Sequence, residues 1–105
     1  MAYEMHPREG RKVVDLECWV ESASQRMSMR LSDLSAGGGF IGTPAEVERG
    51  DRMQVAFILE GREWQCSARV AHVQPERGFG FAFLGDELAD EARLAIERFV
   101  DESES

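Results

Sequence analysis

Residues 78–99 read GFGFAFLGDELADEARLAIERF, and the spacing of their apolar side chains changes at Gly85. Before Gly85, three phenylalanines alternate with glycine and alanine, and this period of two is typical of a β-strand. From Leu88 onward, the apolar residues recur at helical spacing. Acidic residues open this segment, where they favour the positive end of a helix dipole. The pattern predicts an amphipathic helix over about residues 86–100, with Asp86 as its N-cap.

Alternating apolar and polar residues predict further strands upstream, joined by short turns rather than by helices. They lie at about residues 12–20, 27–32, 40–41, 53–59 and 64–72, ahead of the strand at 78–83. Within the long strand, alternate residues are expected on one face, namely Trp64, Cys66, Ala68, Val70 and His72.

Six strands followed by one helix describe a small antiparallel barrel or sandwich with the helix packed against it. We expect the barrel: an all-β fold of six antiparallel strands over about residues 11–84, closed at one end by the C-terminal helix at about 86–100. The helix would present its apolar side to the barrel, through Leu88, Ala92, Ile96 and Phe99. A chain of 105 residues is near the common size of one domain, so residues 1–105 are interpreted as a single domain.

One segment interrupts the alternation. Residues 33–39 read Asp-Leu-Ser-Ala-Gly-Gly-Gly, and three consecutive glycines do not continue a regular strand without a cost in backbone entropy. Such a run predicts a turn in which the backbone takes positive φ or approaches another group closely.

The net charge of −8 argues against binding to nucleic-acid polymers, which usually shows as a basic footprint. Residues 86–105 hold eight acids and two arginines, as expected for a solvated helix face and tail. Residues 8–12, Arg-Glu-Gly-Arg-Lys, are locally basic and would suit a small anion. No apolar run approaches the ~20 residues that span a bilayer, and residues 1–10 contain no signal-peptide core. We therefore expect a cytoplasmic protein that is not inserted in a membrane.

The two cysteines, Cys18 and Cys66, lie inside apolar-patterned segments without a CxxC pair. Buried, reduced thiols are the favoured interpretation and fit the cytoplasm. A disulfide between them is the alternative that the sequence leaves open.

No residues are arranged for catalysis or metal binding. His6 and His72 have no Cys or His at metal-ligand spacing, and Ser35 lacks a GxSxG context. The phenylalanines of residues 79–83 would suit a stacking platform for single-stranded nucleic acid, but their flanks lack a basic groove, which favours core packing. The sequence thus predicts a binding protein with no enzyme activity, no metal and no cofactor.

The glycine-rich segment also carries a family resemblance. Asp33-Leu-Ser35-Ala-Gly-Gly38 matches the pattern Asp/Asn-x-Ser-x-x-Gly of PilZ domains. Residues 49–57 resemble that family's next strand, and residues 78–83 resemble its last strand before a helix. The chain resembles a PilZ domain over about residues 8–100. This resemblance implies binding of the bacterial second messenger cyclic di-GMP by a stand-alone signalling adaptor, which would act through an effector protein or through self-association as a homo-oligomer.

The second PilZ motif is present in altered form. Receptors of the family usually carry Arg-x-x-x-Arg before the first strand, whereas Arg8 and Arg11 are three positions apart and Lys12 follows. If Lys12 fills the second place, the spacing from Arg8 is right and one guanidinium is lost; if Arg11 fills it, the first place falls on Pro7. Arginine binds phosphates and guanine edges with a planar fork of donors, and lysine offers only a point charge.

The resemblance implies a ligand site with two sides. Arg8 and Arg11, supported by Lys12, would clamp the phosphates and guanine faces of the dinucleotide. On the other side, Asp33 and Ser35 would contact guanine edges or phosphate oxygens, and Gly38 would let the backbone come close to the ligand.

Two alternatives remain for these residues. The basic segment would also serve as a solvated loop, and the Asp and Ser would also cap backbone groups of a tight turn without any ligand. In that case the chain is a degenerate PilZ module that binds protein only, for example in motility or pilus assembly, and does not bind the dinucleotide.

Overall fold

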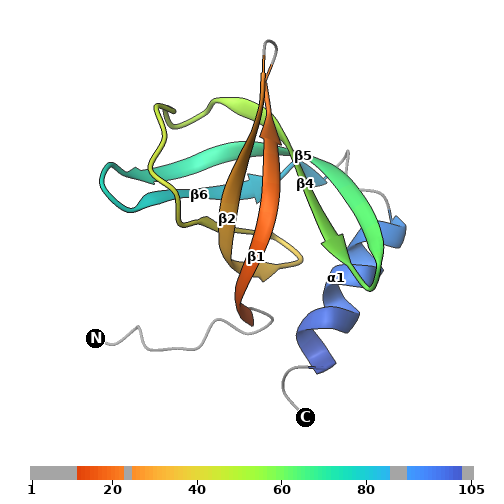
Figure 1. Ribbon diagram of the computed structural model, residues 1–105. Helices are drawn as coiled ribbons and strands as arrows, with labels where there is room; N and C mark the ends of the chain where they lie inside the picture. Colours follow the sequence, from red (N-terminus) through yellow and green to blue (C-terminus); the bar gives the residue numbers. More distant parts are fainter. Residues whose placement is uncertain (1–11, 23–24, 86–89, 103–105) are drawn as a thin grey trace, which may run out of the picture.

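The structure is a computed structural model that describes residues 12–22, 25–85 and 90–102 (Figure 1). Its elements are β1 (Lys12–Glu21), β2 (Arg26–Ser35), β3 (Gly38–Ile41), β4 (Arg52–Leu59), β5 (Arg62–Gln74), β6 (Gly78–Phe83) and α1 (Asp90–Glu102). Among the described residues, the prediction of six strands and one C-terminal helix is confirmed. The expected N-cap Asp86 lies outside the described residues.

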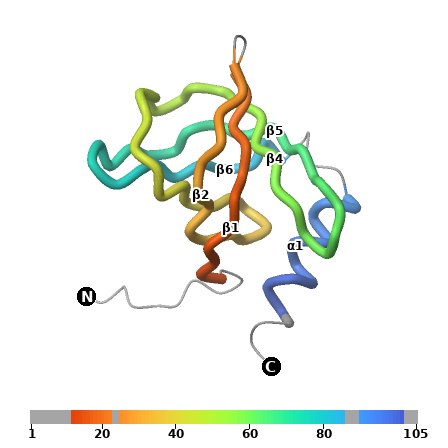
Figure 2. Tube along the Cα trace, in the orientation of Figure 1, coloured from red at the N-terminus to blue at the C-terminus, as the bar shows by residue number. Residues whose placement is uncertain are grey.

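The strands form a closed antiparallel barrel in the order β1-β2-β3-β6-β5-β4. The barrel closes because β4 pairs with β1 as well as with β5. Four of the pairings join strands that follow each other in the chain, while β3 pairs with β6, three strands further on. Figure 2 shows the long crossing of the chain from β3 to β4 that this order requires. The predicted barrel is therefore confirmed, and the pairing of β3 with β6 brings residues 38–41 beside residues 79–82.

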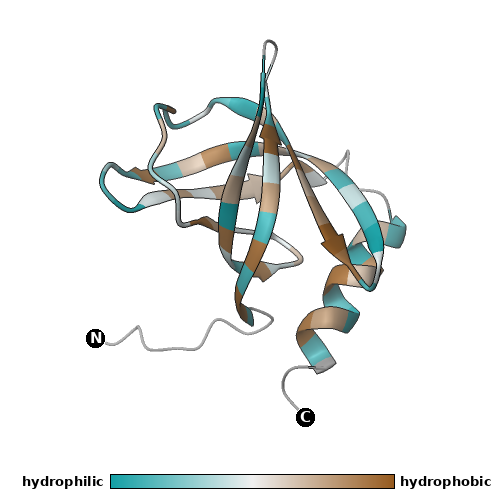
Figure 3. Cartoon of the chain, in the orientation of Figure 1, coloured by the Kyte–Doolittle hydropathy of each residue, from teal (hydrophilic) through white to brown (hydrophobic). Residues whose placement is uncertain are grey.

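Brown and teal bands alternate along strands in Figure 3, and the apolar residues of this pattern fill the interior of the barrel. The largest fully buried side chains include Phe57, Phe79, Leu31, Leu34, Ile41, Val55 and Val70. The three phenylalanines of β6 are all buried, so their expected role in the core is confirmed.

Helix α1 packs its apolar side against the barrel, where it contacts β2 and β4. Ala92, Ile96 and Val100 are buried in the core, and Phe99 is half-buried against it. The fourth expected contact, Leu88, lies outside the described residues. No helix in the described ranges is both long and apolar enough to cross a membrane.

The turn between β2 and β3 is shorter than the sequence suggests. Only Ala36 and Gly37 form it, while β2 continues to Ser35 and β3 begins at Gly38. Gly38 has φ +153°, and a Cβ added there would lie 2.1 Å from the backbone oxygen of Phe81. The glycine run continues a strand because the absence of a side chain lets β3 lie against β6, and the expectation of a close backbone approach is met here.

Both cysteines are free, buried thiols, Cys18 on β1 and Cys66 on β5. The preferred interpretation is confirmed, and the disulfide alternative is wrong. Burial raises the pKa of each thiol from 9.0 to about 11.

Because of these raised pKa values, we expect stability to fall as the pH rises from about 9 to about 11. The unfolded chain releases both thiol protons near their ordinary pKa, whereas the folded chain retains them, so alkaline pH favours unfolding. Each thiol contributes at most about 1.4 kcal/mol per pH unit in that range. Urea unfolding between these pH limits measures the slope. A Cys18→Ala/Cys66→Ala variant should show a shallower slope, and an unchanged slope in that variant would contradict the assignment.

Candidate ligand-binding site

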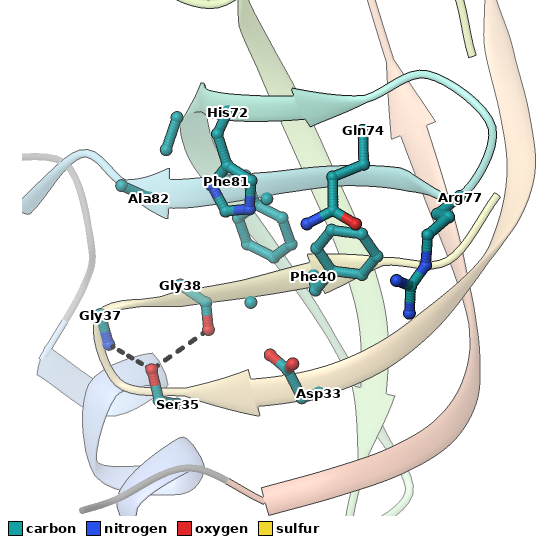
Figure 4. A pocket seen from close by; sticks show the side chains of 13 residues that line it. Asp33, Ser35, Gly37, Gly38, Phe40, His72, Gln74, Arg77, Phe81 and Ala82 are labelled. Atoms are coloured by element: carbon teal, nitrogen blue, oxygen red, sulfur yellow. Dashed lines mark hydrogen bonds between the residues drawn. The ribbon is translucent and has the colours of Figure 1, made fainter. Parts of the chain in front are cut away.

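A hollow of about 660 Å³ lies on the outer face of the barrel, across β2, β3, β6 and β5 (Figure 4). It is lined by Asp33 and Ser35 on the β2 side and by His72, Gln74 and Arg77 on the β5 side. Between them lie residues 37–40 and 80–82. Figure 4 shows the labelled side chains of both sides directed toward the space between them.

The hollow exists because three of the outward residues on the two middle strands, Gly38, Gly80 and Ala82, have small or no side chains, while Phe40 is the large one. Gly38 of β3 pairs with Ala82 of β6, and Phe40 of β3 pairs with Gly80 of β6. On one side of these middle strands, β2 pairs with β3 through Ser35 and Gly38, and side chains of β2 project outward. On the other side, side chains of β5 project outward. Adjacent strands are about 4.8 Å apart, so β2 and β5 stand about 14 Å apart with a floor of backbone between them.

Two β-bulges turn charged or polar side chains outward at this place. The register of β2 against β3 shifts between Leu31 and Asp33, and that of β5 against β6 shifts between Val70 and His72. An extra residue reverses which face the following side chains occupy, and bulges often re-aim a side chain at a functional site. The expectation that His72 shares one face with Val70 is therefore wrong, because Val70 is buried and the bulge places His72 on the exposed face.

An aromatic pair stands on this face. The rings of Phe40 and His72 are stacked, with centroids 6.0 Å apart and an interplanar angle of 28°. The His72 ring lies over Gly80, where an added Cβ would be 2.2 Å from His72 Cε1. Glycine at position 80 thus leaves the space that the imidazole occupies, and the pair presents a flat surface suited to stacking with a base.

Ser35 has a structural role in the turn beside the hollow. Its Oγ accepts a hydrogen bond from the Gly37 amide at 3.2 Å and donates one to the Gly38 carbonyl oxygen at 3.3 Å. A hydroxyl has one donor and two acceptor lone pairs, so one acceptor position remains for a ligand. With these bonds in place, Ser35 suits a donor such as a guanine N–H better than a phosphate oxygen.

An arginine without an ion pair to any described residue stands at the rim of the hollow. Four of the nine described arginines, Arg26, Arg30, Arg62 and Arg98, lie in ion pairs, such as Arg30 with Asp15 at 2.6 Å and Arg98 with Glu60 at 3.2 Å. Arg77, at the rim of the hollow, has no ion pair or hydrogen bond through its side chain in the part of the chain that the structure describes. An unpaired guanidinium is available to a ligand's phosphate.

Three of the six predicted site residues come together here: Asp33, Ser35 and Gly38. Lys12 is not among the lining residues, and its Nζ lies 3.9 Å from the centroid of the Phe99 ring on α1. Arg8 and Arg11 lie outside the described residues, so the clamp stays a prediction.

Sequence reasoning missed Phe40 on β3 and the whole β5 side of the site. Phe40, His72, Gln74 and Arg77 line the hollow, although none belongs to the motif at residues 33–38. A signal was present in the small residues between the phenylalanines of β6, since small outward side chains leave room on a sheet surface. The pairing of β6 with β3, which gives that signal its meaning, is not visible in the sequence.

Together these groups can bind a flat, anionic ligand. The aromatic pair offers a stacking surface, Asp33 offers acceptors for base donors, and Arg77 offers a fork for phosphate. Among the described residues, no three His, Cys, Asp or Glu side chains are grouped to hold a metal ion.

Comparison with known protein families identifies the family of this chain. The profile of the PilZ domain matches residues 6–102. This chain belongs to the PilZ domain family. The hollow therefore lies on the face of a PilZ barrel that carries the Asp-x-Ser-x-x-Gly motif. A search of curated proteins found no significant match to the sequence.

Several solved structures share this PilZ fold at low sequence identity. The inhibitor of motility MotI/DgrA of Bacillus subtilis has a TM-score of 0.80 at 16% identity, over 96% of this chain and 57% of that one. The PilZ domain of CeSA from a cellulose-synthesizing bacterium has a TM-score of 0.67 at 22% identity, over 90% of this chain and 98% of that one. PlzA of Borreliella burgdorferi, solved with c-di-GMP, has a TM-score of 0.70 at 16% identity, over 90% of this chain and 41% of that one. This PilZ chain thus spans about half the length of MotI and PlzA.

Proposed function

We propose that this PilZ domain binds cyclic di-GMP in the hollow between β2 and β5 and acts as a signalling adaptor without catalytic activity. One observation carries the proposal: the motif residues Asp33, Ser35 and Gly38 open onto the same hollow as the Phe40–His72 pair and Arg77. A cyclic dinucleotide with two guanines needs acceptors, a flat surface and cations, and this hollow offers all three. The complex of the structural neighbour PlzA with c-di-GMP supports the choice of ligand.

Adaptor action requires a partner. The signal would pass to an effector protein in the cytoplasm, or would change the self-association of the chain. The sequence names no effector, and titration of the ligand is the first test.

Isothermal titration with cyclic di-GMP tests the proposal directly. If the dissociation constant is about 1 μM, ~100 μM ligand stabilises the fold by about 2.7 kcal/mol. For a domain of this size that raises Tm by roughly 10–20 °C. Absence of both binding heat and a thermal shift at this concentration would refute dinucleotide binding.

A second candidate function is a PilZ module that binds protein only. The hydroxyl of Ser35 already bonds within its own turn, and Lys12 lies over Phe99 rather than at the hollow. The likeness to the fold of MotI, named as an inhibitor of motility, agrees with a role of this kind in motility. This candidate predicts an intact fold that does not respond to cyclic di-GMP.

The predicted clamp gives a further test on the ligand. Arg8→Ala and Arg11→Ala should each weaken binding of cyclic di-GMP by about 1.5–3 kcal/mol, because each would remove a hydrogen bond to a charged group. Titration calorimetry measures the loss, and Arg93→Ala on α1 is the matched control. If both variants bind as wild type does, then the N-terminal segment takes no part in the site, whether or not the hollow binds the ligand.

A further inference from the structure

A second hollow adjoins the first on the β5 side. It measures about 510 Å³ and is lined by Arg49, Gly50, Arg69, Val70, Ala71 and Ala82. Ala71 and Ala82 line the first hollow as well, so the two hollows are neighbours on the same surface. None of the lining residues is acidic, although the chain as a whole carries a net charge of −8.

Backbone pairing aligns the two hollows. Gly38 pairs with Ala82, and Ala82 pairs with Arg69 on the next strand. Two strand spacings, about 10 Å, therefore separate the backbone of Arg69 from that of Gly38. The guanidinium of Arg69 is exposed on the face that carries the motif.

Arg49 is held beside Arg69 by the backbone. The Gly50 amide donates to the Val70 carbonyl oxygen, and the Val70 amide donates to the Asp51 carbonyl oxygen, both at 2.8 Å. The carboxylate of Asp51 accepts a bond from the Glu48 amide at 2.9 Å, so one of its oxygens is used within its own turn. These bonds fix the turn that carries Arg49 to the edge of β5.

The arginines here are placed at a cost to the fold. Arg52 of β4 stands directly opposite Arg69 in the β4–β5 register, and like charges in that position destabilise a strand pair. Neither Arg49 nor Arg69 has an ion pair or side-chain hydrogen bond within the described ranges. The pairing of Arg52 with Arg69 breaks this local rule, and a broken local rule points to a function for the residues involved.

We propose that Arg49 and Arg69 form a second binding site, for a phosphoryl group, next to the dinucleotide hollow. Arg49 and Arg69 line the same hollow, and each guanidinium has the planar fork of donors that phosphate oxygens accept. The inference rests on the proposed function only for the source of the phosphoryl group, which is either cyclic di-GMP or a separate phosphorylated ligand.

The test follows the side-chain Nε–Hε signals of the arginines by NMR while inorganic pyrophosphate is added at constant ionic strength. We expect saturable shifts at Arg49 and Arg69. The double variant Arg49→Gln/Arg69→Gln should weaken the binding of pyrophosphate by about ten- to a hundredfold. Arg93→Gln removes an arginine on α1 that also has no ion pair in the described structure, and should leave binding unchanged. Shifts at Arg49 and Arg69 that do not saturate, or equal weakening by Arg93→Gln, would overturn the site.

A second titration, with cyclic di-GMP, identifies the source. If the dinucleotide shifts Arg49 and Arg69 and prevents the response to pyrophosphate, the phosphoryl group is its own. If it shifts only residues of the first hollow and pyrophosphate still binds, the second site takes a separate phosphorylated ligand. If it causes no shifts at all, the proposed function fails, and the pyrophosphate result still decides the arginine site.

Discussion

Gly38→Ala should lower the free energy of unfolding by about 3 kcal/mol or more. The added Cβ would lie 2.1 Å from the backbone oxygen of Phe81 and 2.9 Å from Cα of Ala82, so β3 and β6 would have to separate. The φ of +153° adds backbone strain, because residues with a Cβ rarely adopt that conformation. Thermal unfolding should show a fall in Tm of more than about 10 °C.

Gly37→Ala is the matched control for this variant. Gly37 is adjacent in sequence, and the nearest atom to its added Cβ is Ser35 Oγ at 3.9 Å, which is ordinary contact. This change should alter stability by no more than about 0.5–1 kcal/mol. If the Gly38→Ala and Gly37→Ala variants have the same Tm, then the close contact of β3 with β6 does not constrain the residue at position 38.

Asp33→Asn should weaken the binding of cyclic di-GMP by about a hundredfold, with little effect on stability. A carboxylate has about four acceptor positions, so Asp33 can receive the two N–H donors of a guanine edge beside any contact it makes within the chain. The asparagine keeps the size but turns an NH₂ donor toward those donors. Loss of one or two hydrogen bonds to a charged group costs about 1.5–3 kcal/mol each.

The comparison with cyclic di-AMP makes this test specific. The corresponding edge of adenine has one donor and one acceptor, so wild type should prefer the guanine ligand and Asp33→Asn should lose most of that preference. Asp15→Asn is the control, since Asp15 is an exposed aspartate of β1 that pairs with Arg30 and does not line the hollow. Titration calorimetry on both variants measures their affinities for the two ligands. Equal affinity of Asp33→Asn and wild type for cyclic di-GMP would exclude the contact between Asp33 and the guanine edge.

The barrel and its helix follow from short-range patterns in the sequence. The phenylalanines of β6 are buried at every second position, and Ala92, Ile96 and Val100 are buried at helical spacing in α1. Each pattern reports only the face that a residue occupies within its own element, and burial of one face suffices to specify strand or helix. Half of the candidate site, the motif at residues 33–38, was found through its resemblance to the PilZ pattern Asp/Asn-x-Ser-x-x-Gly.

The other half of the site was decided by the tertiary structure. Asp33, Phe40, Gly80 and His72 form one row across the sheet only because β3 pairs with β6 rather than with β4. His72 reaches that row because a bulge in β5 reverses the alternation that the sequence predicts. A period of two contains no information on which strand becomes the neighbour or where an extra residue is accommodated. Both are settled when the barrel closes, because closure must satisfy backbone hydrogen bonds and core packing around all six described strands together.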